Sequence, residues 1–317
     1  MKEYTINEIT SIMQSIKGEL GKAVKGQDSL IEQVIIGLFS EGHILIEGVP
    51  GLGKTLLINA LCSIIIGAKF RRIQFTPDIL PADIIGVATE QFKIKKGPIF
   101  TNLLLADEIN RAPAKTQSAL LQAMQERTVN IDGTNYPLDT FFICFATQNP
   151  VDYEGTFPLP EAQKDRFLMK LLVNYPTPEE EQKILMAYRS GFSADQIQTA
   201  RLVPSTNIDE ILAIKESIKK INVHDKILDY ITRIVCATRN INGIRMGSSP
   251  RGSIALFQAA RVKAAMNGRD HVIAQDVKDM VLPVLRHRIN LEPEVLEKGL
   301  TEDDFLTRLL ERVEAPV

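Results

Sequence analysis

The stretch Gly48-Val49-Pro50-Gly51-Leu52-Gly53-Lys54-Thr55 fits the pattern G-x-x-x-x-G-K-[ST] of a phosphate-binding loop. It follows an apolar run at residues 44–46 and precedes an apolar-periodic segment at residues 56–66, so a strand, a loop and a helix are predicted in the required order. Glycine is needed in such a loop because backbone N–H groups turn onto phosphate oxygens in conformations that a Cβ would obstruct. The sequence therefore predicts a nucleotide-phosphate site here.

Two side chains at the end of this loop supply groups that a nucleoside triphosphate requires. Lys54 places a positive charge beside the β- and γ-phosphates, and the hydroxyl of Thr55 is a ligand for Mg²⁺. The helix that begins here adds the partial positive charge of its N-terminus. The candidate nucleotide-binding residues of this region are Gly48, Val49, Pro50, Gly51, Leu52, Gly53, Lys54, Thr55 and Leu56.

The composition is that of an ordinary globular protein, with 44% hydrophobic residues, 24% charged residues and a net charge of −2. This near-neutral balance provides no electrostatic footprint for bulk nucleic-acid binding. No apolar run approaches the roughly 20 residues of a transmembrane helix, and the first residues lack a signal-peptide pattern. The three cysteines and four histidines are scattered, so neither disulfides nor a Cys/His metal cluster is predicted. We expect a cytoplasmic protein whose metal is Mg²⁺ carried with the nucleotide.

Short apolar runs alternate with amphipathic segments over residues 1–190 of the 317-residue chain, whose length is typical of two domains. Continuous apolar strands separated by helices indicate a parallel sheet with helices on both faces, an α/β fold. The predicted helices lie at residues 6–20, 29–39, 56–66 and 116–126, and the predicted strands at residues 44–46, 70–75, 103–105, 142–145 and 168–173.

The remaining pattern predicts a projecting hairpin and a second domain. Residues 127–131 and 134–138 flank Asp132-Gly133, a strong signal for a tight turn between two strands. Residues 191–204 show no period and are interpreted as a linker. Beyond them apolar residues recur at helical spacing without a strand pattern, which predicts a separate all-α domain within residues 191–317.

Two carboxylates end one of the predicted strands. Asp107 and Glu108 follow the apolar run at residues 103–105, and ligands collect at the carboxyl ends of strands in a parallel sheet. Asp107 is placed to hold Mg²⁺, through water, and Glu108 to polarise an attacking water as a general base. An acidic pair after an apolar run is weak evidence alone, but the phosphate loop makes the hydrolytic interpretation strong.

An amide ends another predicted strand. Asn149 follows the apolar run at residues 142–145, where its side chain could hydrogen-bond both the γ-phosphate and the attacking water. Asn149-Pro150 is also a common way to begin a turn, and the residues alone leave both interpretations open.

These motifs, in this order, resemble those of AAA+ ATPases, and their details resemble the MoxR family. The resemblance implies a P-loop NTPase sheet domain (residues 1–190), with a helix-2 insert and a pre-sensor hairpin, and a C-terminal all-α lid domain (residues 191–317). It also implies Mg-dependent ATP hydrolysis. The matching segments are residues 25–27, 48–55, 74–78, 97–100, 107–112, 122–126, 146–150, 159–163, 165–167, 249–251 and 285–288.

The resemblance assigns roles to further residues. Arg166 aligns with the arginine finger that reaches the γ-phosphate bound by a neighbouring subunit, where a guanidinium neutralises the charge of phosphoryl transfer. Lys164 is a weaker candidate for that role. Arg251 aligns with the lid arginine that touches the nucleotide of its own subunit. Gly26 and Gln27 align with the segment near adenine.

Two insertions suggest the kind of substrate. Residues 82–96 resemble the helix-2 insert of the clade that includes MoxR proteins, magnesium chelatase subunits and MCM helicases, and the Asp132-Gly133 hairpin resembles its pre-sensor hairpin. A hairpin that threads DNA is expected to have a basic tip, but residues 130–135 contain no lysine or arginine. Nucleic acid is therefore an unlikely partner, although Lys93, Lys95 and Lys96 weaken the argument slightly.

The leading hypothesis is an ATPase that assembles into a homo-oligomeric ring, expected to be a hexamer, and remodels a protein client. The resemblance implies a von Willebrand factor A-domain protein as partner. The alternatives are a DNA-dependent motor, a magnesium-chelatase-like accessory ATPase and a nucleotide-gated binding module without hydrolysis.

Overall fold

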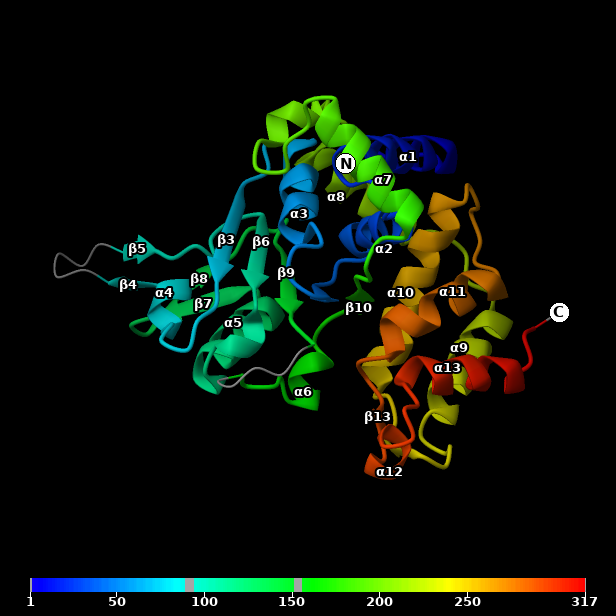
Figure 1. The fold of residues 1–317 in the computed structure, drawn as a ribbon. Coiled ribbons are helices and arrows are strands. Elements are labelled where there is room, and N and C mark those ends of the chain that lie inside the picture. Colours follow the sequence, from blue (N-terminus) through cyan, green and yellow to red (C-terminus); the bar gives the residue numbers. More distant parts are fainter. Residues whose placement is uncertain (1, 89–93, 151–155, 317) are drawn as a thin grey trace.

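A central five-stranded parallel sheet organises the first half of the chain in this computed structural model, which describes residues 2–88, 94–150 and 156–316. The strand order is β10-β1-β9-β6-β3 (Figure 1). β1 (Ile44–Glu47) lies between β10 (Met169–Leu172) and β9 (Ile143–Gln148), and β6 (Leu103–Asp107) lies between β9 and β3 (Phe70–Gln74). Because all five strands are parallel, the carboxyl ends of β1, β6 and β9 meet at one edge.

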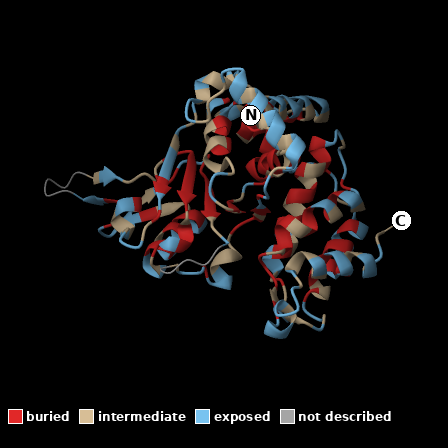
Figure 2. Cartoon of the chain, in the orientation of Figure 1, coloured by how far each residue is buried: buried red, intermediate tan, exposed pale blue. Residues whose placement is uncertain are grey.

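Helices cover both faces of this sheet, as predicted. The covering helices are α1 (Ile6–Ala23), α2 (Asp28–Phe39) and α3 (Lys54–Ser63) on one face, and α4 (Pro81–Ile85) and α5 (Ala114–Glu126) on the other. Side chains of a strand alternate between the faces, so Leu103 and Leu105 of β6 join the first hydrophobic cluster while Leu104 and Ala106 join the second. Figure 2 shows the buried residues concentrated in the strands and on the inward sides of the helices.

Two antiparallel hairpins extend from the sheet domain (Figure 1). One pairs β7 (Thr128–Ile131) with β8 (Thr134–Pro137) through the predicted turn, where Asp132 and Gly133 both have positive φ values, 47° and 83°. The other pairs β4 (Gly86–Ala88) with β5 (Ile94–Lys96), within the segment that resembles a helix-2 insert. Lys93 of that segment lies outside the described residues.

The C-terminal part is mainly helical and packs beside β10. Its central helix, α10, contacts α1, α2, α9 and α11, so this part lies directly against the sheet domain (Figure 1). The helices of this part are α8 (Ile208–Ile218), α9 (Asp225–Ala237), α10 (Pro250–Met266), α11 (Ala274–Leu285), α12 (Pro293–Leu296) and α13 (Glu302–Arg312), whereas α7 (Pro178–Arg189) precedes the predicted linker. None of these or the preceding described helices is both long and apolar enough to cross a membrane.

Several details differ from the sequence-based expectation. The predicted helix 56–66 ends at Ser63, and β2 (Ile65–Ile66) follows and pairs with β11 (Thr206–Asn207). A second short pair, β12 (Ile244–Met246) with β13 (Asn290–Leu291), lies within the helical part. Pairings of two or three residues leave no period in a sequence, which explains why they were not expected.

The predicted linker contains a 3-10 turn, η2 (Ile197–Ala200), that contacts α1 and α3. The segment that joins the two parts is thus packed against the sheet domain. The division into residues 1–190 and 191–317 stays a prediction.

Candidate nucleotide-binding and hydrolysis site

The phosphate loop connects β1 to α3 as the sequence predicts. Gly53 precedes the helix with a φ of 74°, in the left-handed region that favours glycine. Gly48 lies against β10's end, where a Cβ would come within 2.7 Å of the Val173 carbonyl oxygen. Nζ of Lys54 donates to the carbonyl oxygens of Gly48 (2.6 Å) and Val49 (2.9 Å), so the ammonium group is held over the loop.

The ammonium group of Lys54 lies in a partly desolvated position that also feels the nearby carboxylates. Burial lowers the pKa of Lys54, and the charges of Asp107 and Glu108 act in the opposite direction. A polyanionic ligand would favour the protonated form of Lys54, since phosphates stabilise its positive charge.

Asp107 is the last residue of β6 and is 8% exposed. Its Oδ1 accepts a 2.5 Å hydrogen bond from Oγ1 of Thr147, and its Oδ2 accepts from Nη2 (2.6 Å) and Nε (3.1 Å) of Arg72. Three donors therefore fix the orientation of this carboxylate.

Glu108 follows with a φ of 57°, a conformation that turns its side chain away from the strand direction. Its backbone N–H donates to Oγ1 of Thr147 (2.8 Å). Its Oε2 accepts from Nε2 of Gln74 (3.1 Å) and from Nη1 of Arg111 (3.0 Å). The candidate general base is thus oriented by both its backbone and its side chain.

The predicted residues from Pro50 to Leu56, with Asp107, Glu108 and Asn149, line one cavity of 480 Å³, whereas Gly48 and Val49 do not line it. Asn149 lines it at the end of β9, so the structure places this amide beside the two carboxylates and the loop. Thr55 and Asp107 present oxygen donors to the same space, the ligand type that Mg²⁺ prefers. The lining residues include Pro50, Gly51, Leu52, Gly53, Lys54, Thr55, Leu56, Arg72, Gln74, Asp107, Glu108, Thr147, Gln148 and Asn149.

A smaller cavity of 170 Å³ adjoins the loop and is suited to a nucleobase. It shares Gly51, Leu52, Gly53, Leu56 and Ala194 with the larger cavity, and its other walls are mainly apolar. Among the wall residues contributed by α7 and the segment after it are Ile184, Ala187, Tyr188 and Phe192. Sequence reasoning missed these residues, although 184, 187 and 188 recur at helical spacing.

The segment predicted to lie near adenine borders this smaller cavity. Gln27 lines it, and its Nε2 donates to the Leu52 carbonyl at 3.4 Å. Gly26, at a φ of 75°, lies behind it, where a Cβ would meet the side chain of Glu180 at 2.5 Å. Gly26 therefore lets α7 approach residues 25–27 and is not among the lining residues.

The two predicted arginines lie elsewhere, in a separate cavity of 320 Å³. Arg166 and Arg251 both line it, and no residue that lines the phosphate-loop cavity does so. Nη1 of Arg166 donates to the Leu121 carbonyl (3.3 Å), and Nη1 of Arg251 lies 3.5 Å from Oδ2 of Asp165. Lys164, the weaker finger candidate, lines neither cavity.

Arg251 lines the cavity of Arg166 and not the phosphate-loop cavity, and its predicted contact with the nucleotide of its own subunit stays a prediction. The first turn of α10 lies against the segment that carries Arg166, where Oγ of Ser249 donates to Oδ2 of Asp165 (3.0 Å) and Nη1 of Arg251 lies 3.5 Å from the same oxygen. Arg251 is thus grouped with Arg166 and not with the phosphate loop of the same chain.

Known proteins are similar to this chain in sequence and in fold. Residues 43–169 match the ATPase family associated with various cellular activities (AAA), and residues 236–309 match the AAA lid domain. The chain is 44% identical to the chaperone MoxR1 of Mycobacterium tuberculosis over 94% of this chain and 81% of that protein. It is 30% identical to the protein MoxR of Methylorubrum extorquens, over 94% and 93%.

A solved structure agrees with these relatives. The crystal structure of a candidate ATPase from Cytophaga hutchinsonii superposes with a TM-score of 0.90 at 39% identity and covers 98% of this chain and 97% of its own. The sequence, the fold and the site together show that this chain belongs to the MoxR family of AAA+ ATPases.

Proposed function

We propose that the protein hydrolyses Mg-ATP between two copies of the chain and uses the energy to remodel a protein client. Membership of the family makes it an ATPase with a chaperone-like role. The observation that carries the more specific proposal is the separation of two half-sites. One cavity holds the loop with both carboxylates, and the other holds Arg166 and Arg251.

The first half-site binds Mg-ATP and activates the attacking water. Lys54 and the loop amides hold the phosphates, while the base occupies the apolar cavity beside α7. Thr55 and Asp107 would hold Mg²⁺, which neutralises charge on the β- and γ-phosphates. Glu108 accepts a proton from the attacking water, and the amide of Asn149 orients that water and the γ-phosphate.

The second half-site acts on the nucleotide of the adjacent copy. A guanidinium that reaches a transferring phosphoryl group raises the rate by about 10³–10⁵ in other enzymes. Arg166 and Arg251 lie together and away from their own loop, so we infer that both serve the neighbouring subunit. Such a head-to-tail contact closes into a ring when its rotation closes, and we propose a hexamer.

The client is proposed to be a protein, with a von Willebrand factor A-domain protein as partner. The support is the family's chaperone-like role together with the absence of basic residues from the projecting β7–β8 hairpin. That hairpin, residues 128–137, contains no lysine or arginine. A DNA-threading hairpin would instead offer positive charge to phosphates.

Capture with the Glu108→Gln variant tests this function. The variant keeps the shape of the site but lacks the base, so it should bind ATP and hydrolyse it about 10²–10⁴ times more slowly. The variant with ATP should retain a protein client that the Lys54→Ala, Glu108→Gln double variant does not retain. Unchanged turnover would reject Glu108 as base, and retention of nucleic acid alone would favour the DNA motor.

A further inference from the structure

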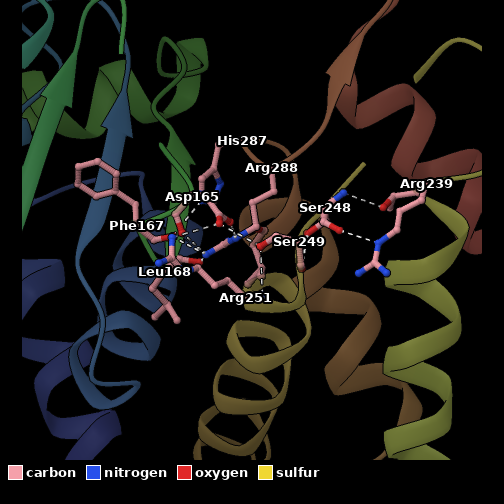
Figure 3. Close-up of polar contacts among 11 residues, drawn as sticks. Asp165, Phe167, Leu168, Arg239, Ser248, Ser249, Arg251, His287 and Arg288 are labelled. Carbon is pink, nitrogen blue, oxygen red and sulfur yellow. Dashed lines mark hydrogen bonds and ion pairs between the residues drawn. The ribbon is translucent and has the colours of Figure 1, made fainter. Parts of the chain in front are cut away.

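The segment that carries Arg166 is held by the C-terminal helical part. Residues 165–168 connect α6 (Glu161–Lys164) to β10, and Arg166 lies within them. The chain that follows α11 passes directly beside this segment (Figure 3). Nε2 of His287 lies 3.0 Å from the Phe167 carbonyl oxygen, and Nη1 of Arg286 donates to the Lys170 carbonyl at 3.3 Å.

Arg288 makes the densest set of these contacts. Its Nε donates to Oδ1 of Asp165 (3.0 Å), its Nη2 to the Phe167 carbonyl (2.6 Å) and its Nη1 to the Leu168 carbonyl (2.9 Å), as Figure 3 shows. The planar guanidinium thus hydrogen-bonds one side chain before Arg166 in the sequence and two backbone carbonyls after it. A single hydrogen-bonding group spans the whole segment.

The charge of Arg288 is buried beside Asp165. Arg288 is 5% exposed, and burial lowers its pKa to about 10, against the opposing effect of Asp165. The residue is therefore charged at neutral pH, and the Asp165 carboxylate compensates this buried charge. The pair joins the helical part to the sheet domain through groups that are costly to separate.

The other carboxylate oxygen of Asp165 contacts residues at the start of α10. Oδ2 accepts from Oγ of Ser249 (3.0 Å) and lies 3.5 Å from Nη1 of Arg251 (Figure 3). Gly252 brings the start of α10 close to the same cluster, since a Cβ there would lie 2.1 Å from Oγ of Ser248 and 3.4 Å from Cδ of Arg288. One carboxylate therefore links residues 165–168, hereafter the finger segment, to α10 and to the end of α11.

The Arg166 side chain has few contacts of its own. Nη1 donates to the Leu121 carbonyl, and Nε is buried without a hydrogen-bond partner among the described residues. Its direction therefore follows the backbone of residues 165–168. We propose that Arg288 and Asp165 are positioning residues that hold Arg166 in its reach for the adjacent subunit's nucleotide. This rests on the proposed function of Arg166.

The test combines Arg288→Lys with Arg166→Ala. Lysine keeps the charge, but its point-like ammonium cannot hold the carboxylate and both carbonyls in the same geometry. Misplacing a catalytic group by about 1 Å can cost about 100-fold, so Arg288→Lys should lower kcat about 10- to 100-fold while KM for ATP stays within about twofold. In the Arg166→Ala background it should add less than about twofold, because both changes remove one function.

Arg269→Lys is the matched control. Arg269 makes a bidentate pair with Asp276 within the helical part, with Nη2 2.6 Å from Oδ1, and its side-chain hydrogen bonds to the described residues reach only His271 and Asp276, not residues 165–168. It should leave kcat unchanged. Asp165→Glu is a second variant that keeps the charge but moves the carboxylate by one methylene, and it should behave like Arg288→Lys. Thermal unfolding of each variant verifies that it is folded.

The outcomes distinguish the positioning role of Arg288 and Asp165 from the finger role of Arg166. An unchanged kcat in folded Arg288→Lys and Asp165→Glu would overturn the positioning role, and so would a full multiplication of the Arg288→Lys and Arg166→Ala losses in the double variant. If Arg166→Ala alone left kcat unchanged, the finger assignment in the proposed function would fall first.

Discussion

The hydroxyl of Thr147 donates to Oδ1 of Asp107 at 2.5 Å and accepts the backbone N–H of Glu108 at 2.8 Å. Thr147 belongs to β9 and is 1% exposed, whereas both carboxylates belong to the end of β6. One buried side chain on a neighbouring strand thus fixes the residue that would hold Mg²⁺ and the residue that would act as base.

Removing this hydroxyl should reduce catalysis without removing the nucleotide site. Thr147→Val has nearly the same shape but neither donates nor accepts, so the Asp107 carboxylate and the backbone N–H of Glu108 each lose a hydrogen-bond partner. We expect kcat to fall by about 10- to 100-fold, while ATP affinity, set mainly by the loop, changes little. Thr147→Ser keeps the hydroxyl and should retain most activity. Equal activity of the Val and Ser variants in a phosphate-release assay would contradict this role.

The apolar cavity beside α7 should determine affinity for the nucleobase. Ala187→Phe would fill that cavity and should weaken ATP binding by roughly tenfold or more, because the base loses its contact surface. Inorganic tripolyphosphate, which has no base, should bind as before. Leu185→Phe is the control, since Leu185 is 66% exposed on the same helix and lines neither cavity. Equal losses for ATP and tripolyphosphate would mean that the cavity does not hold the base.

His43 should make stability depend on pH. It is buried at 7% exposure, with Nε2 3.1 Å from the Met124 carbonyl and Nδ1 accepting the Cys144 N–H at 3.0 Å, an arrangement that only the neutral ring satisfies. Burial lowers its pKa from 6.5 to about 4. The unfolded chain therefore binds a proton between these values that the native protein does not bind.

The sign follows from that difference. The contribution of neutral His43 is complete above pH 6.5, declines as the pH falls to about 4, and is constant below that, for a total of about 3 kcal/mol. His43→Gln should lose stability less steeply between pH 6.5 and pH 4.5 than the native chain. Urea unfolding at several pH values measures this, and parallel curves for the two proteins would contradict it.

The sequence was sufficient to predict the parts of the fold and of the candidate site that depend on residues close together in the chain. The phosphate loop, the acids after β6 and the tight Asp132-Gly133 turn are local patterns, and each has the predicted conformation. The parallel sheet followed from apolar runs that are buried on both faces.

Residues whose roles depend on tertiary packing were not predicted. Thr147 was not singled out because its importance comes from the end of β6, 39 and 40 positions away in the sequence. The wall formed by α7 was missed for the same reason. A sequence also does not show which way a helix start faces, so it did not indicate that Arg251 and Arg166 would line the same cavity.

Mixing inactive variants tests the central claim that the site is shared between copies. Lys54→Ala removes the phosphate contact and Arg166→Ala removes the finger, so each alone should have little ATPase activity. In a randomly mixed 1:1 ring, about one quarter of the interfaces pair an intact loop with an intact finger, so up to that fraction of native activity should return. The partner assignment of Arg251 predicts the same recovery for Arg251→Ala with Lys54→Ala.

A mixture of Arg166→Ala with Arg251→Ala provides the sharpest comparison. If both arginines act across the interface, every contributing face in that mixture is defective and no activity returns, whereas an Arg251 that served its own subunit would allow recovery. Phosphate release from rings verified by light scattering is the measurement. We predict recovery only in mixtures that contain Lys54→Ala, and the absence of recovery in those assembled mixtures would contradict a shared site.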